Sequence, residues 1–543
     1  MPLRQQPTNP YEYYIRLHDL VSGFTHPDGW REGSLLRAAL QSVELTLHCA
    51  AEAHDDPRPS SFTEPRVQRL LDMAEDHLRA LGRLPGLTPP PGMAVARTVE
   101  DRPSPGLAVL DRLPDEQVRP VLDAFTQAAD RLGYGLGVEH QVEAARTRLG
   151  LPAHPPKAVT LDYRHLAAPE DVLRLVSPVA DGPEDHLFAS AHQITECWLH
   201  IAHAYVDAAV EAAEEQRWEN AAGELRAAAS AVDRASDSGQ VLELMDLADY
   251  HRLRVHLRDG SGAQSRAARE LPRKLHAALR PLTKSLTETG ATLAGLIAHR
   301  AGDTARRNYL TALKLLSAGC QNFLFEHYLL ALGVLGSRST GTLGYEVAAL
   351  AKRAAQPLLP EVNEAHHDLV QYTNLQYAAD AGSLITRREA EAGVSHAPRP
   401  TTDPGTATGT PDEDALKARV RTYFRAIEER APDTWLALFD AEHGRLYDQP
   451  TARPFVGRDH LKVFISAMFD TFHELSTEVT GLTVDGDRAT AHWTVRAVSY
   501  QGAPVTYSGR EEFSFTEDAS IATAVVHWSP PEVAARLWPD IAA

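Results

Sequence analysis

The residues best suited to chemistry lie in one short segment, Phe188–Trp198, whose sequence is FASAHQITECW. Phe188, His192 and Glu196 follow one another at intervals of four, which places an aromatic ring, an imidazole and a carboxyl group on one face of a helix. Histidine changes charge near neutral pH and is a common metal ligand. A lone histidine on an apolar helix face is more often a hydrogen-bonded core residue, so this segment gains meaning only from the segments that accompany it.

Two later segments carry groups that complement this face. Tyr250 and Arg254 lie one helical turn apart and precede the sequence SGAQS at residues 261–265. A guanidinium binds a carboxylate through two parallel hydrogen bonds, so Arg254 can clamp the acid group of an amino acid while Tyr250 adds a hydroxyl contact. The alternative for Arg254 is a solvated position in an arginine-rich helix. In the third segment, His327 precedes Thr342 by fifteen residues.

These segments, in this order, resemble the tryptophan 2,3-dioxygenase superfamily, whose members bind haem b. The family combines a His-Gln-x-x-Glu-x-Trp helix, a Tyr-x-x-x-Arg plus Ser-Gly-x-Gln-Ser unit, and a histidine followed by Gly-Thr-Gly-Gly. The first two patterns are intact here and the third is altered to GTLG, across roughly residues 158–390. The resemblance implies that His327 is the proximal ligand of the haem iron and that His192 is the distal histidine that hydrogen-bonds the indole N–H.

The resemblance also implies a substrate pocket and a reaction. The substrate-binding residues would be Phe188, Tyr163, Tyr250, Arg254 and Thr342. The expected reaction is oxidation of the indole ring of tryptophan or a tryptophan derivative with O2, in which C2–C3 cleavage gives an N-formylkynurenine-type product. The catalytic residue would be His192, which orients the ring and tunes the acidity of its N–H without acting as a full base.

Departures from the family leave alternatives open. The family's loop Gly-Thr-Gly-Gly-Ser-Ser-Gly is shortened here to GTLG, which favours a larger or modified substrate. One alternative is therefore a haem-dependent monooxygenase or hydroxylase of a modified tryptophan or another aromatic amino acid. An extra N-terminal unit and a fused C-terminal domain favour specialised metabolism over general catabolism. A second alternative, from a different functional class, is a non-catalytic scaffold that binds haem or an aromatic ligand.

The composition indicates which binding partners and which cellular compartment to expect. The chain has 54 basic and 73 acidic residues, a net charge of −19, which disfavours nucleic acid and anionic membranes as partners. Its three cysteines form no CxxC pair, as is typical of a reducing compartment. The N-terminus lacks an apolar signal core, and no apolar run approaches about 18 residues. We expect a soluble cytoplasmic protein that binds a small molecule and O2.

A chain of 543 residues exceeds one ordinary hydrophobic core. We expect an N-terminal helical region at residues 1–157, a haem-binding helical domain at 158–393, and a Pro-, Gly- and Thr-rich flexible linker at 394–412. Residues 413–543 begin with helices and continue with alternating strand patterns. The predicted fold is therefore a mainly α helical bundle followed by an α+β cone that resembles SnoaL-like and nuclear transport factor 2-like domains.

The C-terminal cone has candidate functional residues of its own. Strand patterns are expected at Ser476–Val484, Arg488–Ser499, Val505–Thr516 and Ile521–Trp528. Polar side chains that could line its interior are Tyr447, Asp448, His460, His473, Tyr500, Tyr507 and His527. SnoaL-like domains use such groups as acid/base pairs in cyclisation or hydrolysis. Non-catalytic domains of this cone-shaped class serve in dimerisation, which is the alternative here.

The N-terminal region contains a faint repeat of the histidine helix. Residues Leu35–His48 can be laid on Leu187–His200 without gaps, so that Gln41, Glu44 and His48 match Gln193, Glu196 and His200. Leu40 stands in the place of His192, so the region reads as a degenerate copy of the family's first helices, with chance similarity of two Ala- and Leu-rich helices as the alternative. The family is tetrameric because neighbouring N-terminal helices close each other's pockets. We expect a homo-oligomer, either a dimer or a tetramer, or a lower oligomer if the duplicated unit closes the pocket within one chain.

Overall fold

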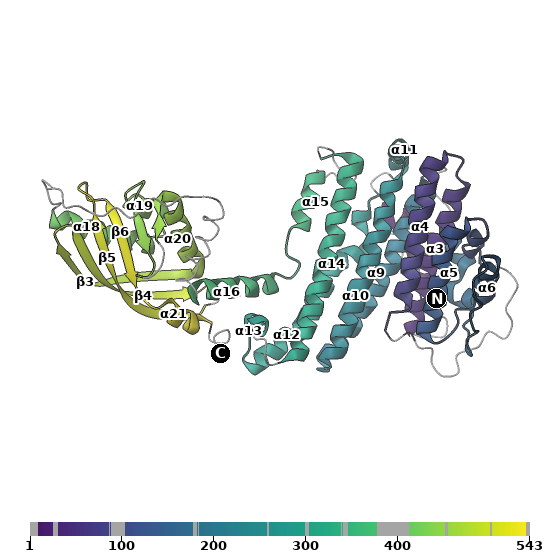
Figure 1. Ribbon diagram of the computed structural model, residues 1–543, viewed down its shortest axis with the longest axis horizontal. Coiled ribbons are helices and arrows are strands. Elements are labelled where there is room, and N and C mark those ends of the chain that lie inside the picture. The colour runs from purple at the N-terminus through teal and green to yellow at the C-terminus, as the bar shows by residue number, and fades with distance from the viewer. Residues whose placement is uncertain are drawn as a thin grey trace. The chain divides into compact units, whose positions relative to one another are not determined.

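The computed structural model describes most of the chain. The described residues are 9–24, 31–85, 87, 104–176, 182, 184–257, 260–298, 303–337, 339, 346–376, 412–450, 454–499 and 502–538. The chain divides into two compact units, one formed by Met1–Gly290 with Ala301–Pro360 and the other by Ala291–Arg300 with Glu361–Ala543. Figure 1 shows that the first unit is built of helices and that the second contains a sheet.

Six long helices form the frame of the first unit. They are α3 (Arg31–Asp55), α4 (Ser60–Leu81), α9 (Asp185–Glu214), α10 (Trp218–Gln240), α12 (Arg266–Thr289) and α14 (Thr304–Leu335). The helix α10 packs against both α9 and α14, and α3 packs against both α4 and α9, so these helices run side by side (Figure 1).

Shorter elements complete this unit around the long helices. Toward the N-terminus they are α1 (Pro10–Tyr14), α2 (Leu17–Phe24), η1 (Leu107–Asp111), α5 (Asp115–Leu132), α6 (Glu139–Arg148), α7 (Tyr163–Ala167), α8 (Pro169–Leu173) and η2 (Arg174–Val176). Further along the chain they are η3 (Val241–Leu244), α11 (Leu247–Leu257), η4 (Gly262–Gln264) and α15 (Val347–Ala354).

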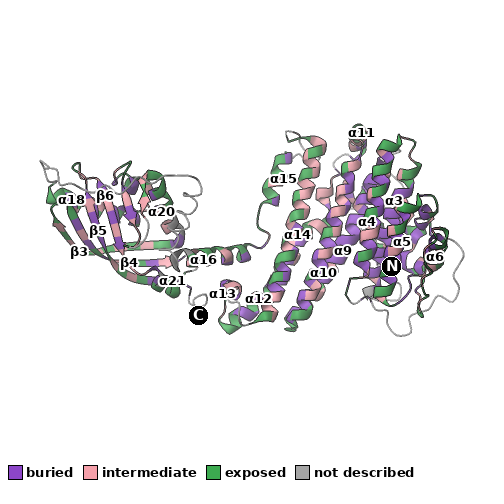
Figure 2. Cartoon of the chain, in the orientation of Figure 1, coloured by how far each residue is buried: buried purple, intermediate pink, exposed green. Residues whose placement is uncertain are grey.

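Small buried side chains allow the central helices to approach closely. In α10 the buried face consists mainly of alanines, among them Ala221, Ala228 and Ala235. Alanine is a strong helix former and leaves room for a neighbouring backbone. The inner helices are therefore buried over much of their length, while exposed residues gather on the outer faces (Figure 2).

The second unit is an α+β domain with one six-stranded sheet. Its strands are β1 (Arg445–Tyr447), β2 (Phe455–Val456), β3 (Phe472–Asp485), β4 (Arg488–Ser499), β5 (Pro504–Phe515) and β6 (Ile521–His527), in the spatial order β2-β1-β6-β5-β4-β3. All neighbours are antiparallel except β1 and β6. The helices are α13 (Leu293–Ala298), α16 (Pro360–Gln376), α18 (Glu413–Glu428), α19 (Pro432–Leu436), α20 (Gly457–Thr471) and α21 (Pro530–Leu537).

Strict alternation along β4 gives the sheet a buried face. Ala489, Ala491, Trp493, Val495 and Ala497 are buried, whereas the residues between them are exposed or half-buried. Side chains on a strand alternate between the two faces, so this pattern turns one face of the sheet toward the helices. The predicted α+β C-terminal domain is confirmed.

The boundaries of the compact units differ from the predicted domains in two respects. The predicted region 1–157 lies in one compact unit with most of the predicted region 158–393. The helices α13 and α16, by contrast, contribute Ala294 and Ala365 to the core of the C-terminal unit. Within the described residues, no helix is long and apolar enough to cross a membrane. The three cysteines, all in the helical unit, are free and buried.

Candidate functional site

The helical unit encloses a cavity of about 600 Å³. Its walls come from α9, from the segment η3–α11–η4, and from α12, α14 and α15, with α1 closing one side. Pockets for cofactors and drug-sized ligands measure roughly 300–1,000 Å³. Its size and its mainly apolar walls therefore suit a flat aromatic ligand.

The two histidines singled out from the sequence meet in this cavity. His192 lies on α9 and His327 lies on α14, 135 positions later in the chain. Both face Gly262 of η4: a Cβ atom at this glycine would lie 3.2 Å from His192 Nε2 and 3.5 Å from His327 Cε1. The glycine thus leaves open a space that is bordered by two imidazoles.

The hydrogen bonding of His192 fixes which of its nitrogens faces the cavity as an acceptor. Its Nδ1 lies 2.8 Å from the carbonyl oxygen of Phe188, one turn earlier on α9. A carbonyl can only accept, so Nδ1 carries the proton and Nε2 keeps its lone pair. Burial lowers the pKa of His192 to about 4, so the ring is neutral at physiological pH. The Phe188 ring packs 4.2 Å from the imidazole and forms part of the cavity wall.

His327 is the second neutral imidazole of the cavity. Burial lowers its pKa, and the positive charge of nearby Arg353 lowers the pKa further. Its ring forms no hydrogen bond to any of the described residues. A neutral imidazole whose ring makes no hydrogen bond is the form in which histidine ligates iron. These features, together with the open space at Gly262, fit the haem that the sequence implies.

The aromatic wall beside His192 comes from Tyr11 of α1 rather than from Tyr163. The Tyr11 ring packs edge-on against His192 with centroids 5.4 Å apart. Its hydroxyl donates to Glu196 Oε1 at 3.1 Å, and its backbone N–H donates to Gln264 Oε1 at 3.2 Å. Burial raises the pKa of Glu196 to about 7, although the hydrogen bonds from Ser265 and Tyr11 act in the opposite direction.

Tyr163 is not among the residues that line the cavity, and its predicted role there is corrected. The Tyr163 hydroxyl donates to Glu44 Oε1 at 2.7 Å, on the helix α3. Glu44 also accepts hydrogen bonds from Ser104 Oγ and, at 3.1 Å, from the N–H of Gly106. The physical reason is that the segment that contains Tyr163 packs on α3, whereas the segment that contains Tyr11 packs on α9, the helix that carries His192.

The remaining predicted substrate residues fall into three groups. Tyr250 on α11 lines the cavity and is half-buried. Arg254, one turn later, is half-buried and close enough to Tyr250 to influence its hydroxyl electrostatically, but it does not line the cavity. Thr342 lies outside the described residues. The structure therefore brings together Phe188, His192, Tyr250 and His327.

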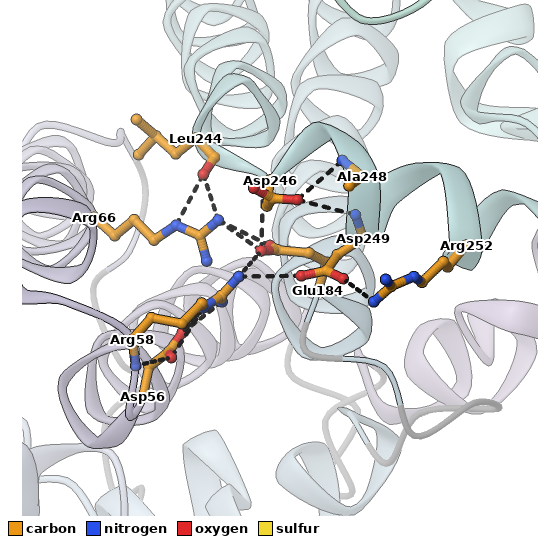
Figure 3. Close-up of polar contacts among 9 residues, drawn as sticks. All are labelled: Asp56, Arg58, Arg66, Glu184, Leu244, Asp246, Ala248, Asp249 and Arg252. Atoms are coloured by element: carbon orange, nitrogen blue, oxygen red, sulfur yellow. Dashed lines mark hydrogen bonds and ion pairs between the residues drawn. The ribbon is translucent and has the colours of Figure 1, made fainter.

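A buried ion-pair network holds the start of α11 against α9 (Figure 3). Glu184, directly before α9, is fully buried, and its carboxylate accepts hydrogen bonds from Arg58 Nη1 at 2.6 Å and Arg66 Nη2 at 2.8 Å. The backbone N–H of Asp246 donates to the same carboxylate at 3.2 Å. Arg66 Nε also donates to the carbonyl oxygen of Leu244 at 2.8 Å. The network therefore joins the regions that carry His192 and Tyr250.

The helix α11 depends on this network because its own packing is sparse. Its buried residues are Leu253 and Leu257, whereas the side chains of Leu247 and Val255 are 51% and 75% exposed. Asp246 Oδ1 caps the helix by accepting from two backbone N–H groups. The position of the Tyr250 side chain in the cavity is thus set largely by buried charges outside it.

The C-terminal unit contains a separate cluster of buried acidic and aromatic groups. Tyr423 donates to Glu511 Oε1 at 2.7 Å, and Trp528 Nε1 donates to Asp448 Oδ1 at 3.0 Å. Burial raises the pKa of Glu511 to about 8 and the pKa of Asp448 to about 6. Tyr507 packs beside Trp528 with ring centroids 5.2 Å apart. Two carboxyl groups that are partly protonated near neutral pH can act as a general acid and a general base.

Only some of the predicted C-terminal residues belong to this cluster. Asp448 and Tyr507 do, whereas His460 and His473 are exposed. Tyr447 and His527 are half-buried, and His527 Nε2 lies 3.3 Å from Glu512 Oε1. Tyr500 lies outside the described residues. The cluster members missed from the sequence are Tyr423, Glu511 and Trp528.

Comparison with known proteins identifies the second unit. Residues 420–524 match the family of SnoaL-like domains. No curated protein sequence matches the chain. Among solved structures, the epoxide hydrolase/cyclase-like enzyme SalBIII, which is described in pyran ring formation of the polyether salinomycin, is 20% identical, with 22% of this chain and 92% of SalBIII covered and a TM-score of 0.20.

Two further structures have similar coverage. An NTF2-like protein of unknown function from Burkholderia pseudomallei is 18% identical over 23% of this chain and 97% of its own, with a TM-score of 0.21. A candidate polyketide cyclase from Xanthomonas campestris is 18% identical over 23% of this chain and 98% of its own, with a TM-score of 0.21. Residues 420–524 therefore belong to a SnoaL-like domain.

Proposed function

We propose that the helical unit is a haem-dependent oxygenase that uses O2 to oxidise the indole ring of tryptophan or a tryptophan derivative. The observation that carries the proposal is the meeting of two neutral, half-buried imidazoles, His192 and His327, in a cavity of about 600 Å³. His327 would ligate the iron of haem b, because its ring has no competing hydrogen bond among the described residues. Bound haem would supply the iron at which O2 is activated.

The residues of the chain position the substrate. His192 Nε2 is an acceptor, so it can receive a hydrogen bond from the indole N–H and hold the ring in one orientation. Phe188 and Tyr11 wall the same side of the cavity and keep water from the ring. A histidine with a pKa of about 4 is a weak base, so His192 orients the N–H and accepts a share of its proton rather than removing it.

The outcome that we favour is cleavage of the C2–C3 bond to an N-formylkynurenine-type product. Insertion of a single oxygen atom into a modified tryptophan or another aromatic amino acid is the first alternative. A scaffold that binds haem or an aromatic ligand without turnover is the second. The three are separated by measuring O2 consumption and the mass of the product, which gains two oxygen atoms, one oxygen atom or none.

The first test is an optical spectrum of the purified protein after reconstitution with haem, before and after reduction, beside His327→Ala. A Soret band that is present in the wild type and lost or shifted in the variant places haem on His327. His276→Ala, a change on α12 away from the lining residues, is the control for nonspecific haem uptake. Absence of haem uptake by the wild type would sink the oxygenase proposal.

A second candidate function concerns the SnoaL-like domain, where desolvation raises the pKa of the half-buried Asp448 and of the buried Glu511 beside aromatic side chains, an arrangement that favours acid/base chemistry. This domain would then act on the product of the helical unit. In the full chain, Asp448→Asn should leave O2 consumption unchanged while an intermediate accumulates. An identical product distribution in wild type and variant would leave the domain with a structural role.

A further inference from the structure

Two arginines line the cavity of the helical unit where its wall is exposed to solvent. Among the described lining residues only two are exposed, Arg269 on α12 and Arg353 on α15, and every other one is buried or half-buried. Within the part of the chain that the structure describes, neither guanidinium takes part in an ion pair. By contrast Arg266, on α12 but outside the lining, pairs with Glu270 at 3.1 Å.

No acidic side chain of the cavity neutralises these two arginines. The one carboxylate among the described lining residues belongs to Glu326 on α14. Its oxygens accept hydrogen bonds from Ser236 Oγ and, at 2.6 Å, from Asn322 Nδ2. Among the described residues, these two guanidinium groups thus have no acidic partner, in a chain whose net charge is −19, and can attract a negatively charged group.

We propose that Arg269 and Arg353 bind the carboxylate groups of a ligand whose apolar ring system fills the cavity. Guanidinium groups bind carboxylates in a planar, bidentate geometry, and the apolar interior accepts only the uncharged part of such a ligand. The ligand therefore enters ring first and keeps its acid groups at the opening. This inference rests on the proposed function and names which residues orient the ligands of that site.

Two ligands of the proposed site carry this chemistry. Haem b has two propionate groups on one edge of its macrocycle, and an amino-acid substrate has one carboxylate. Arg254, the arginine predicted from the sequence to bind the substrate, does not line the cavity, so the exposed pair is the better placed cationic group for either ligand. Both ligands would place a carboxylate beside Arg269 and Arg353.

The first arm of the experiment measures porphyrin binding in the full chain. The double variant Arg269→Gln/Arg353→Gln is compared with Arg266→Gln/Arg273→Gln, two exposed arginines of α12 that do not line the cavity. Each protein is titrated with haem, with its dimethyl ester and with metal-free protoporphyrin IX. We expect the affinity for the free acids to fall roughly three- to tenfold in the first double variant, with the ester unaffected and the control unchanged.

The second arm measures substrate binding to haem-loaded protein. L-tryptophan is compared with tryptamine, which lacks the carboxylate. If the substrate is the source of the carboxylate, the preference for L-tryptophan is lost in the Arg269→Gln/Arg353→Gln variant while the preference for the porphyrin acid over its ester remains. If the propionates are the source, the reverse holds. Added salt should weaken whichever preference is present, since the arginines are exposed.

The outcomes separate this inference from the proposed function. Unchanged acid preferences in both arms would overturn the inference even if haem binds. Arginine-dependent binding of metal-free protoporphyrin IX, without any haem ligation by His327, would keep the inference and refute the oxygenase. A wild-type protein that binds neither porphyrin nor tryptophan would overturn both.

Discussion

Replacing Gly262 by alanine would fill the space between the two imidazoles with a single methyl group. The new Cβ atom would lie 3.2 Å from His192 Nε2 and 3.5 Å from His327 Cε1, and no third atom lies nearer than 3.6 Å. The first distance is short enough that a ring must shift by a few tenths of an ångström, and the second is an ordinary contact. The apo protein can therefore accommodate the methyl group, whereas a ligand between the rings cannot share its space.

Gly262→Ala should stabilise the folded apo protein but weaken ligand binding. Gly262 is not among the described glycines with positive φ, so alanine adds no backbone strain. Such a change reduces the entropy of the unfolded chain and stabilises a protein by about 0.4–1 kcal/mol, less the small cost of moving the ring. Overpacking of a filled site costs typically about 1–3 kcal/mol, which corresponds to roughly 5- to 150-fold weaker ligand binding.

The assay is urea unfolding of the apo protein together with a haem titration followed at the Soret band. Gly223→Ala is the matched control, because this glycine lies in the helix α10 and an added Cβ would meet nothing within 4 Å. We expect both variants to unfold at or above the urea concentration of the wild type and only Gly262→Ala to lose haem affinity. A Gly262→Ala protein that binds haem like the wild type would refute the placement of the ligand between His192 and His327.

Three further predictions concern the surroundings of the cavity. Glu184→Gln should destabilise the helical unit by about 3–5 kcal/mol, because it leaves Arg58 and Arg66 without their shared buried counter-ion. The control Arg252→Gln removes a 78% exposed partner of Asp249 and should change the free energy of unfolding by less than about 1 kcal/mol. Equal effects of the two changes in urea unfolding would contradict the role given to the network in Figure 3. Burial raises the pKa of Glu196 to about 7 from a usual value near 4.5, so the protonated side chain favours the folded state. This stabilisation is full below about pH 4.5 and is lost as the pH rises through 7. The loss should reach about 3 kcal/mol in the wild type and be missing in Glu196→Gln, when the free energies of unfolding of the two proteins are compared at pH 5 and pH 8. Tyr11→Phe and Tyr163→Phe should each cost about 1–2 kcal/mol, because each removes one of the hydrogen bonds that Glu196 or Glu44 accepts. Only Tyr11→Phe should alter the affinity of haem-loaded protein for L-tryptophan, and a substrate effect of Tyr163→Phe would show that the two tyrosines have been assigned to the wrong helices.

Local spacing predicted the parts of the site that lie on single helices. Phe188 and His192 are four residues apart, and their rings are in contact at 4.2 Å. The same rule grouped Glu196 with them, but its carboxyl group bonds to Tyr11, 185 positions earlier in the chain. Spacing fixes which face of a helix a residue occupies and does not say which distant segment covers that face.

In the sheet, too, strands with a clear local pattern could be predicted from the sequence, and strands without one could not. The pattern over Arg488–Ser499 gave β4 its observed bounds, because alternation over twelve residues is a strong signal. The strands β1 and β2 have three and two residues, too few for any period to be visible. Glu511 could have been found, since it lies in phase with the buried Phe513 and Phe515 of β5, and a carboxyl group on that face must be buried.

The helices α9 and α3, whose sequences can be aligned without gaps, show which of the aligned residues support the fold. On α9, Gln193 donates to the carbonyl oxygen of Ile15, and Glu196 accepts from the hydroxyl of Tyr11, so both residues bind the N-terminal covering segment. On α3, Gln41 donates to the carbonyl oxygen of Ala167 and Glu44 accepts from Tyr163 in the same way.

The glutamine and the glutamate are thus present in both helices, and in both they bind the segment that covers the helix. At the position that differs, α9 has His192 and α3 has Leu40, which is fully buried. A leucine at this place completes a core, whereas a neutral histidine presents an acceptor to a cavity. The chemical capacity of the helical unit therefore depends on one position in each helix, and the docking of the covering segments does not.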